Sequence, residues 1–399
     1  MRLYVGLFAI VAFIVAVDFL FYVLFMRKNK QKSRLLWATI ITSISYIAFW
    51  TYLFTTSPKT YGYLEPDNYP LFFLAGAIMI VFYIPRMLSI IIKALLWVPQ
   101  KLRLLKIKLI NMVALSLGAL VMLVSISGIL IIRFQFRVIE QTIEHASIPA
   151  SFDNYRIIQI SDLHLGTAKN YKSEFTGMVN KINDLNPDIV VFTGDLVNNF
   201  ATELEGWTPI LRQVKAKYGV YAILGNHGYG DYVPWKTPQD KQRNFMDVVT
   251  FFDSVNWQLL RNQSISLTSG TDTIILAGVE NWGNPPFPRY GNLNQTVPNS
   301  MEHPVILLSH DPSHWDEEVI KHPANIFLTL SGHTHGFQFG IRSEKINLSP
   351  VSLKYEKWGG LYEYNNRYLY VNIGAGTIGF PGRIGMRPEI TLLTLKHLK

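Results

Sequence analysis

Residues 325–336 read NIFLTLSGHTHG, an apolar run followed by two histidines that stand one residue apart between glycines. The run has the length and the bounding turn residues of a short buried strand. His333 and His335 are therefore predicted to lie on a loop just past a strand end. Such a pair could bind a metal, act as an acid and a base, or have no chemical role, and the rest of the sequence has to decide.

Other segments have the same form and alternate with helical patterns. The first two enclose a predicted helix that ends at the NPD sequence of residues 186–188 and has five apolar residues on one face: Phe175, Met178, Val179, Ile182 and Leu185. This alternation predicts a layered α/β fold with its sheets in the interior and its active site on the loops beyond the strand ends. The further predicted strands are YRIIQIS (155–161), DIVVFTG (188–194), GVYAILG (219–225), TIILAGV (273–279) and PVILLSH (304–310).

Five of the predicted strands end in short polar side chains that can bind metals. A single Asp or Asn at such a place is an ordinary turn residue, and a lone histidine is more often structural than a ligand. Five strand ends in a row with oxygen or imidazole donors indicate a set of ligands for two metal ions. In chain order the donors are Asp162, His164, Asp195, Asn226, His227, His310, His333 and His335.

Two neighbouring divalent cations explain these residue types. A carboxylate can bridge them, and imidazole and oxygen donors complete each site. This mixture suits manganese, iron or zinc and does not distinguish among them. A water held between two cations becomes hydroxide near neutral pH, and the same cations screen the charge of a phosphate ester.

The order D-x-H, G-D, G-N-H, a lone His and G-H-x-H closely resembles the calcineurin-like metallophosphoesterase superfamily over residues 155–395. The apolar N-terminal part and the late RIGMRPEITLLTL segment (383–395) are similar to bacterial membrane-associated phosphodiesterases. The resemblance implies a four-layer sandwich of two mixed sheets with helices outside. It also implies a first metal site of Asp162, His164 and His335, a second of Asn226, His310 and His333, and Asp195 as the bridge.

By the same resemblance, His227 is no ligand but binds the substrate with Asn226 and protonates the leaving oxygen. The family commonly places an acidic residue after this histidine, whereas this chain has Gly228. Asp231 or Asp311 could take over the missing role. We therefore expect weakened acid catalysis rather than an inactive site.

The N-terminal third has a membrane-like composition. The chain is 49% hydrophobic and 16% charged, against roughly 25% charged in soluble domains. Residues 1–150 hold 15 basic and 5 acidic residues, a net charge of +10, between apolar stretches. Lipid headgroups rather than nucleic acids are the expected partners. The absence of cysteine excludes disulfides and thiolate ligands.

Four stretches are long enough to cross a bilayer, at about residues 3–25, 35–54, 71–92 and 109–132. The first has too long an apolar part for a signal peptide. The loops RKNKQKSR and KLRLLKIK are basic, whereas the loop of residues 55–70 has only Lys59, so the C-terminal part is predicted to lie outside the cytoplasm. Residues 1–133 form the predicted transmembrane region, 134–152 a juxtamembrane helix and linker, and 153–399 the phosphoesterase domain.

Several weaker signals remain. Asp18 and Arg86 lie in apolar stretches, where a pairing between helices, or extension of Arg86 toward the interface next to Pro85, is favoured over a functional role. The GAGTIG segment (374–379) is interpreted as a loop whose glycines let the backbone approach its neighbours closely. No helix is predicted after it, and no nucleotide cofactor is expected. Residues 281–298 are either a lid or a surface insertion. Candidate phosphate or headgroup contacts are Arg289, Arg383 and Arg387.

Together these observations predict a membrane-anchored phosphoesterase with two divalent metals that hydrolyses a phosphodiester, lipid-linked or from the cell envelope. The predicted location is the outer side of a bacterial cytoplasmic membrane. One alternative is a pyrophosphatase for a UDP-sugar lipid, although that substrate would be cytoplasmic. The other is a non-catalytic sensor or transport accessory, which Gly228 favours and the complete ligand set opposes.

Overall fold

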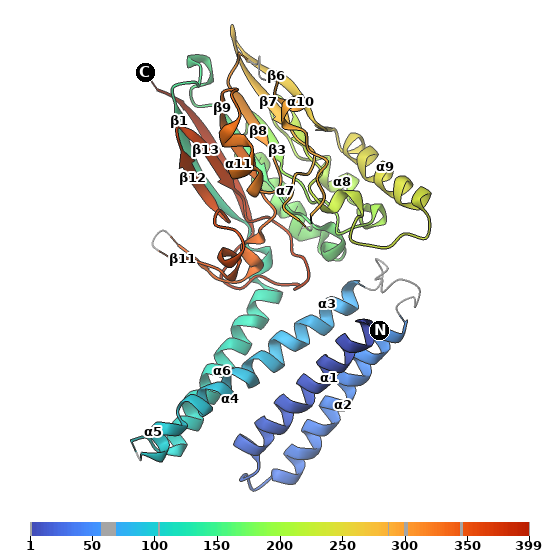
Figure 1. Cartoon of the computed structure of the whole chain (residues 1–399), viewed down its shortest axis with the longest axis vertical. Coiled ribbons are helices and arrows are strands. Elements are labelled where there is room, and N and C mark those ends of the chain that lie inside the picture. Colours follow the sequence, from blue (N-terminus) through green and yellow to red (C-terminus); the bar gives the residue numbers. More distant parts are fainter. Residues whose placement is uncertain are drawn as a thin grey trace. The chain divides into compact units, whose positions relative to one another are not determined.

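The computed structural model describes residues 2–56, 69–102, 104–285, 287–298, 302–343 and 346–398. The chain divides into two compact units (Figure 1). The first comprises Met1–Leu130 and the short segment Gly379–Gly382, and the second comprises Ile131–Ile378 and Arg383–Lys399.

The first unit is helical. Among the residues that the structure describes, four helices are long and apolar enough to cross a membrane, Gly6–Met26, Lys32–Thr55, Leu71–Leu95 and Ile107–Phe134, and the fourth continues past the unit boundary at Leu130. They match the four predicted stretches. Lys59 and the loop around it lie outside the described residues. The elements are α1 (Arg2–Phe21), the π-helix η1 (Tyr22–Met26), α2 (Lys32–Thr56), α3 (Tyr69–Ile78), the π-helix η3 (Met79–Tyr83), α4 (Ile84–Leu95), α5 (Trp97–Lys101) and α6 (Ile107–Leu130).

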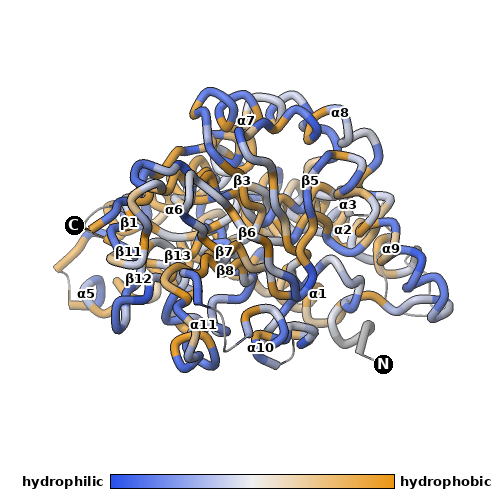
Figure 2. Tube along the Cα trace, turned by 90° about the horizontal axis from the view of Figure 1, so that it is seen from above, coloured by the Kyte–Doolittle hydropathy of each residue, from blue (hydrophilic) through white to orange (hydrophobic). Residues whose placement is uncertain are grey.

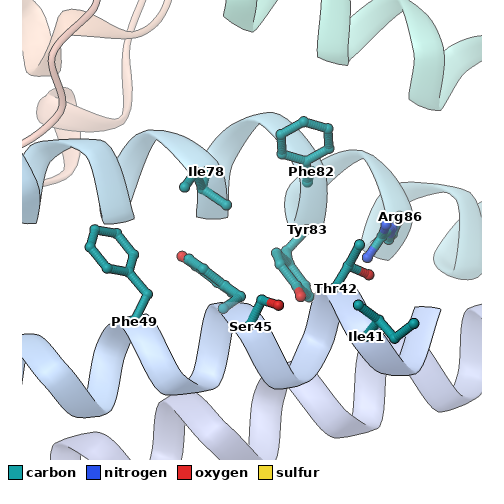
Figure 3. A pocket seen from close by; sticks show the side chains of 9 residues that line it. Ile41, Thr42, Ser45, Phe49, Ile78, Phe82, Tyr83 and Arg86 are labelled. Atoms are coloured by element: carbon teal, nitrogen blue, oxygen red, sulfur yellow. The ribbon is translucent and has the colours of Figure 1, made fainter. Parts of the chain in front are cut away.

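The two charged residues predicted within the spans form an ion pair, with Arg86 Nη1 lying 2.5 Å from Asp18 Oδ1. The other oxygen of Asp18 accepts hydrogen bonds from the hydroxyls of Ser43 at 2.5 Å and Tyr83 at 3.2 Å. The predicted pairing between helices is confirmed. Figure 3 shows the adjoining pocket of about 400 Å³, in which Arg86 and Tyr83 lie among aromatic and aliphatic side chains.

The second unit contains two six-stranded sheets. The order of the first is β1-β14-β2-β3-β4-β5, and that of the second is β12-β13-β9-β8-β7-β6. The first sheet comprises β1 (Arg137–His145), β14 (Glu389–His397), β2 (Arg156–Ile160), β3 (Ile189–Phe192), β4 (Val220–Ala222) and β5 (Trp257–Leu259). The second comprises β12 (Gly360–Tyr364), β13 (Arg367–Val371), β9 (Ile326–Ser331), β8 (Val305–Leu308), β7 (Asp272–Gly278) and β6 (Gln263–Ser269).

Strand β1 lies where a juxtamembrane helix and linker were predicted. It pairs in parallel with β14 over its full length, from Arg137 opposite Glu389 to His145 opposite His397. The prediction for residues 134–152 is therefore wrong over this strand, because the segment is an integral edge strand of the first sheet.

The two sheets pack face to face and helices cover their outer faces. One apolar cluster fills the space between the sheets, with Ile157 and Val191 from one sheet and Leu276 and Leu308 from the other. A second cluster joins the first sheet to α7 (Lys172–Asp184) and α9 (Pro238–Ser254). A third joins the second sheet to short helices that include α10 (Leu293–Thr296) and α11 (Ser313–Glu317). The predicted four-layer sandwich is confirmed, and Figure 2 shows hydrophobic colouring around β3 against mostly hydrophilic colouring on α7.

The strand register determines where the functional loops meet. Strands β2, β3 and β4 are mutually parallel, as are β7, β8 and β9. The carboxyl ends of parallel neighbours lie at the same edge of a sheet. The loops that follow these strands therefore converge, and they carry the predicted metal-binding residues.

Candidate metal centre

The structure brings the predicted donors together in one buried cluster. Their ligand atoms form three groups within which all atoms lie less than 4.8 Å apart. His164 belongs to the first and second groups and Asp195 to the second and third, so the groups are continuous. The groups are Asp162–His164–His335, His164–Asp195–His227 and Asp195–His310–His333.

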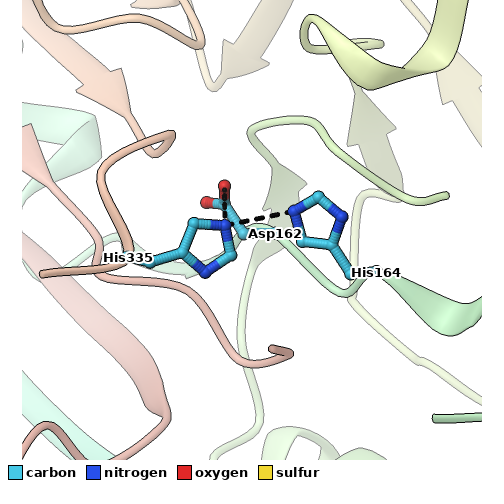
Figure 4. Close-up of side chains that lie close together, drawn as sticks. All are labelled: Asp162, His164 and His335. Carbon is cyan, nitrogen blue, oxygen red and sulfur yellow. Dashed lines mark hydrogen bonds and ion pairs between the residues drawn. The ribbon is translucent and has the colours of Figure 1, made fainter. Parts of the chain in front are cut away.

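The first group matches the predicted first metal site. Figure 4 shows the side chains of Asp162, His164 and His335 pointing toward one another. Nε2 of His335 lies 3.2 Å from Oδ1 of Asp162 and 3.1 Å from Nε2 of His164. Two imidazole nitrogens and a carboxylate oxygen aimed at one point are the donor set of a metal site.

Asp195 lies between the two predicted sites. Its Oδ2 is 2.9 Å from Nε2 of His310 and 3.7 Å from Nε2 of His164. On the far side, Nδ1 of His333 lies 2.8 Å from Oδ1 of Asn226. This placement is what a bridging carboxylate requires.

The backbone at this site is unusual. Five of the predicted ligands adopt positive φ angles, namely Asp162, His164, Asp195, His333 and His335. Such conformations are costly for residues other than glycine and tend to cluster at functional sites. Neighbouring glycines provide the space, because a Cβ added at Gly225 would collide with Oδ1 of Asp195. The GAGTIG segment has this function too, since a Cβ at Gly376 would collide with the backbone of Leu163.

The charges of the cluster favour cation binding. Burial opposes the ionisation of Asp195, yet His310 and His227 hold its pKa well below the usual range. Burial lowers the pKa of His333 to about 4 and also depresses that of His164. The carboxylate is therefore ionised and these two imidazoles are neutral at neutral pH, which are the forms that bind metals. Burial opposes the protonation of His310, yet Asp195 raises its pKa to about 9, so His310 would release a proton on binding a metal.

The hydrogen bonds that hold the candidate ligands from outside the cluster also suit metal binding. Nδ1 of His310 lies 2.7 Å from the carbonyl oxygen of Thr193, and Nε2 of His333 lies 2.8 Å from the hydroxyl of Tyr355. These contacts orient each ring and turn its other nitrogen toward the cluster, where Asp195 faces His310 and Asn226 faces His333. The ring nitrogens that face the cluster have other candidate ligands as their neighbours, since Nε2 of His164 lies 3.1 Å from Nε2 of His335 and Nε2 of His310 lies 2.9 Å from Oδ2 of Asp195. Imidazole and carboxylate donors that converge in this way fit metal ions.

Comparison with known proteins identifies the family. The sequence model of the calcineurin-like phosphoesterases matches residues 155–337, which contain every predicted metal ligand. The uncharacterized metallophosphoesterase YkuE of Bacillus subtilis is 32% identical over 64% of this chain and 84% of that protein. The chain belongs to the calcineurin-like phosphoesterases. Its second unit is therefore a domain of metal-dependent phosphoric ester hydrolases.

Two further matches differ in extent. A transmembrane protein with a metallophosphoesterase domain from Danio rerio is 30% identical over 65% of this chain, and the match spans 57% of that protein. Among solved structures, the phosphopantetheinyl hydrolase of Mycobacterium tuberculosis matches over 58% of this chain and 91% of its own, at 14% identity and a TM-score of 0.32.

In this metallophosphoesterase, His227 is oriented by the backbone. Its Nδ1 lies 2.5 Å from the carbonyl oxygen of Asn198. Neither predicted substitute for the missing acidic residue contacts its ring. Asp231 binds Lys241 and the hydroxyl of Tyr290, and Asp311 lies with its Oδ2 3.7 Å from Nε2 of His333.

The loop that provides this carbonyl is held by the buried Glu203. The carboxylate accepts hydrogen bonds from the amides of Asn198 at 2.6 Å and of Asn199 and Phe200 at 2.9 Å. Burial raises the pKa of Glu203 to about 7, although these amides act in the opposite direction. Sequence reasoning missed this residue, because nothing in its local pattern marks it as an anchor.

The metal centre opens into a pocket of about 270 Å³ whose lining includes Asp195, Asn226, His227, His333 and His335. The same lining includes residues that the sequence analysis did not select, among them Lys354, Tyr355 and Phe337. Phe287 also reaches this pocket, with its ring centroid 4.7 Å from that of His333. The segment of residues 281–298 therefore contributes Phe287 to the lining of the site.

The three predicted phosphate or headgroup contacts, Arg289, Arg383 and Arg387, do not line this pocket. Arg383 is fully buried, and its guanidinium donates to the carbonyls of Gly376 and Ile373. That prediction is wrong, because a side chain occupied in this way cannot reach the substrate. Arg387 is exposed but lines a different pocket. Arg289 stacks over Trp282 and donates to the carbonyl of Gly283, which indicates a structural role.

Proposed function

We propose that this chain is a membrane-anchored phosphodiesterase whose active site holds two divalent ions, of manganese, iron or zinc. One observation carries the proposal: a buried carboxylate, Asp195, lies between two groups of carboxylate, imidazole and amide donors, and this cluster borders a pocket that His227 also lines. When bound, the ions would activate a water molecule and screen the charge of the phosphate.

The residues of the chain would divide the remaining work. Because the carbonyl of Asn198 accepts from Nδ1 of His227, Nε2 is the nitrogen left for the leaving oxygen, and it donates a proton when the imidazole is protonated on both nitrogens. Asn226, whose Nδ2 donates to the hydroxyl of Tyr232 at 2.8 Å, is held with its oxygen toward His333. Lys354 adds a positive charge at the pocket that could bind a phosphate oxygen.

The proposed substrate is a phosphodiester that is lipid-linked or part of the cell envelope. The proposed location is a bacterial cytoplasmic membrane with the catalytic unit outside the cytoplasm. The basic loops that follow the first and precede the fourth span support this orientation. A reporter fused to the C-terminus tests it: activity restricted to the cytoplasm would sink the orientation and favour the alternative cytoplasmic pyrophosphatase.

The deciding experiment is diester hydrolysis by the full chain in detergent, stripped of metal and resupplied with manganese, iron or zinc. The full chain is required because a fragment beginning at residue 150 would lack β1 (Arg137–His145). We expect metal-dependent cleavage of bis-p-nitrophenyl phosphate that exceeds cleavage of the monoester and is lost in Asp195→Asn. The exposed Asp184→Asn is the matched control. Two bound ions per chain without turnover would instead indicate a sensor.

A further inference from the structure

A second pocket in the catalytic unit, of about 220 Å³, is basic and shares no lining residue with the metal centre. It is lined by three arginines, one glutamate and apolar side chains: Arg137, Arg342, Arg387, Glu389, Ile132, Ile139 and Ile373, together with Gly385. We propose that this pocket binds the phosphate headgroup of an anionic lipid of the bilayer in which the chain is anchored.

The single acidic residue of the pocket is already neutralised. One carboxylate oxygen of Glu389 pairs with Arg342. The other accepts hydrogen bonds from the hydroxyls of Tyr370 at 2.6 Å and Thr391 at 2.8 Å. Glu389 is also almost completely buried. Its charge is therefore balanced by Arg342 and is not available to the other two arginines.

Arg137 and Arg387 are consequently free cations. Both side chains are exposed, and within the described residues neither forms an ion pair. Arg137 lies opposite Glu389 in the pairing of β1 with β14, and Arg387 lies two residues before Glu389 in the chain. Two guanidinium groups at one pocket match the oxygens of a phosphate, which arginine binds in a bidentate manner.

The chain itself places this pocket near the bilayer. Ile132 lines the pocket and follows the end of α6 at Leu130 by two residues, which limits their separation to about 8 Å. Basic residues next to a membrane span attract anionic headgroups. Whatever the orientation of the two units, this lining residue stays close to the end of the last span, and we expect the pocket to reach lipid headgroups there.

An exposed apolar hairpin adjoins the basic pocket. Arg342 belongs to β10 (Ile341–Arg342), which pairs with β11 (Asn347–Leu348). The paired residues Ile341 and Leu348 are 54% and 62% exposed. Exposed aliphatic side chains near a basic pocket are a combination that suits a lipid surface, because the apolar groups enter the acyl region while the cations bind headgroups. A free phosphate ion would make no contact with the apolar side chains of Ile341 and Leu348.

The test titrates the full chain in neutral detergent, with chelator present so that the metal centre binds no phosphate ester. Dioctanoyl phosphatidylglycerol, dioctanoyl phosphatidylcholine and inorganic phosphate are compared, with native mass spectrometry as the readout. The variant is Arg137→Gln/Arg387→Gln. The matched control is Lys236→Gln/Arg243→Gln, two exposed basic residues outside the pocket. Arg342 is left intact, because its loss would leave Glu389 buried and unpaired.

We expect phosphatidylglycerol to bind saturably to the wild type and the control, and at least tenfold more weakly to the variant. Phosphatidylcholine should bind to all three proteins at least tenfold more weakly than phosphatidylglycerol binds to the wild type. Inorganic phosphate should not compete with phosphatidylglycerol. Equal binding by variant and wild type would overturn the proposal, as would displacement of the lipid by inorganic phosphate at the same concentration. Unchanged manganese uptake by a separate sample of the variant verifies that the catalytic unit is folded.

Discussion

Nδ1 of His227 lies 2.5 Å from the carbonyl oxygen of Asn198, so the histidine beside the metal centre is oriented by a backbone group. A carbonyl only accepts hydrogen bonds, and the contact therefore places the proton of the neutral ring on Nδ1. Gly228 stands where the family commonly has an acidic residue, and the Asn198 carbonyl fulfils the orienting part of that role without its negative charge.

We expect His227→Ala to slow the cleavage of diesters according to their leaving group. For an alkyl diester, whose leaving oxygen needs a proton, kcat should fall about 10²–10⁴-fold. For bis-p-nitrophenyl phosphate, whose leaving group is a stable anion, the loss should be less than about tenfold, since little acid catalysis is needed. Steady-state kinetics on both substrates measure the two losses of kcat, and the exposed His303→Ala is the control. Equal losses on both would assign His227 to binding alone.

Glu203 should give the protein a pH-dependent stability. Its folded-state pKa of about 7 exceeds the ordinary value of 4.5 because the carboxyl is buried. The stabilising contribution is therefore fully present below pH 4.5 and is lost as the pH rises through about 7. Relative to Glu203→Gln, the unfolding free energy of the wild type should fall by on the order of 3 kcal/mol between pH 4.5 and 8.

Denaturant unfolding of the full chain in detergent, followed by tryptophan fluorescence, measures this difference. The exposed neighbour Glu205 provides the control Glu205→Gln, which should follow the wild type. A wild-type advantage that grows with pH would mean that the amides of Asn198, Asn199 and Phe200 outweigh burial and keep Glu203 ionised.

Tyr355 should act on the metal centre through His333. Its hydroxyl lies 2.8 Å from Nε2 of His333 and keeps the opposite nitrogen toward Asn226 and the second site. Loss of such an outer contact typically weakens metal binding 10–100-fold. We expect Tyr355→Phe to weaken manganese binding by about this factor in competition with a chelating dye. Tyr364→Phe, a change on an exposed strand residue, should have no effect, and unaltered affinity in Tyr355→Phe would refute the role.

Lys354 is the cation of the substrate pocket. Its Nζ lies 4.5 Å from the ring centroid of Phe287 and 5.2 Å from that of Tyr355. Within the described residues it forms no ion pair, so its charge is available to a phosphate oxygen. We expect Lys354→Gln to raise KM about tenfold with little change in kcat, an effect that high salt should reduce. Lys215→Gln is the control, and a KM unaffected by Lys354→Gln would exclude the contact.

The clustering of the candidate metal ligands could be predicted because each of them follows a strand that is recognisable in the local sequence. The apolar runs that became β2, β3, β4, β8 and β9 are short-range signals, and the donors at their ends are visible in the sequence. Their meeting in space follows from the parallel register of neighbouring strands. The pairing of Asp18 with Arg86 could be expected for a similar reason, because an unpaired charge in an apolar helix is costly.

The errors arose where the decisive partner is distant in sequence or belongs to the backbone. Strand β1 pairs with β14, roughly 250 residues later, and no local pattern in residues 137–145 indicates that pairing. Arg383 was selected for its charge, whereas three backbone carbonyls around it determine its role. The carbonyl of Asn198 that orients His227 likewise leaves no signature in the residue type.

The ion pair between Asp18 and Arg86 should couple the stability of three membrane helices. Arg86 of α4 contacts Asp18 of α1, which also accepts from Ser43 of α2. Removing one partner leaves a charge unpaired among apolar side chains, at a cost of about 3–5 kcal/mol, whereas removing both costs less. We expect Asp18→Asn and Arg86→Met each to lower the unfolding temperature of the full chain in detergent, and the double variant to recover most of the loss. Ser43→Ala, which removes one hydrogen bond, should have a smaller effect. Additive losses in the double variant would show that the two residues stabilise the helices independently, because coupled partners cannot each be lost at full cost.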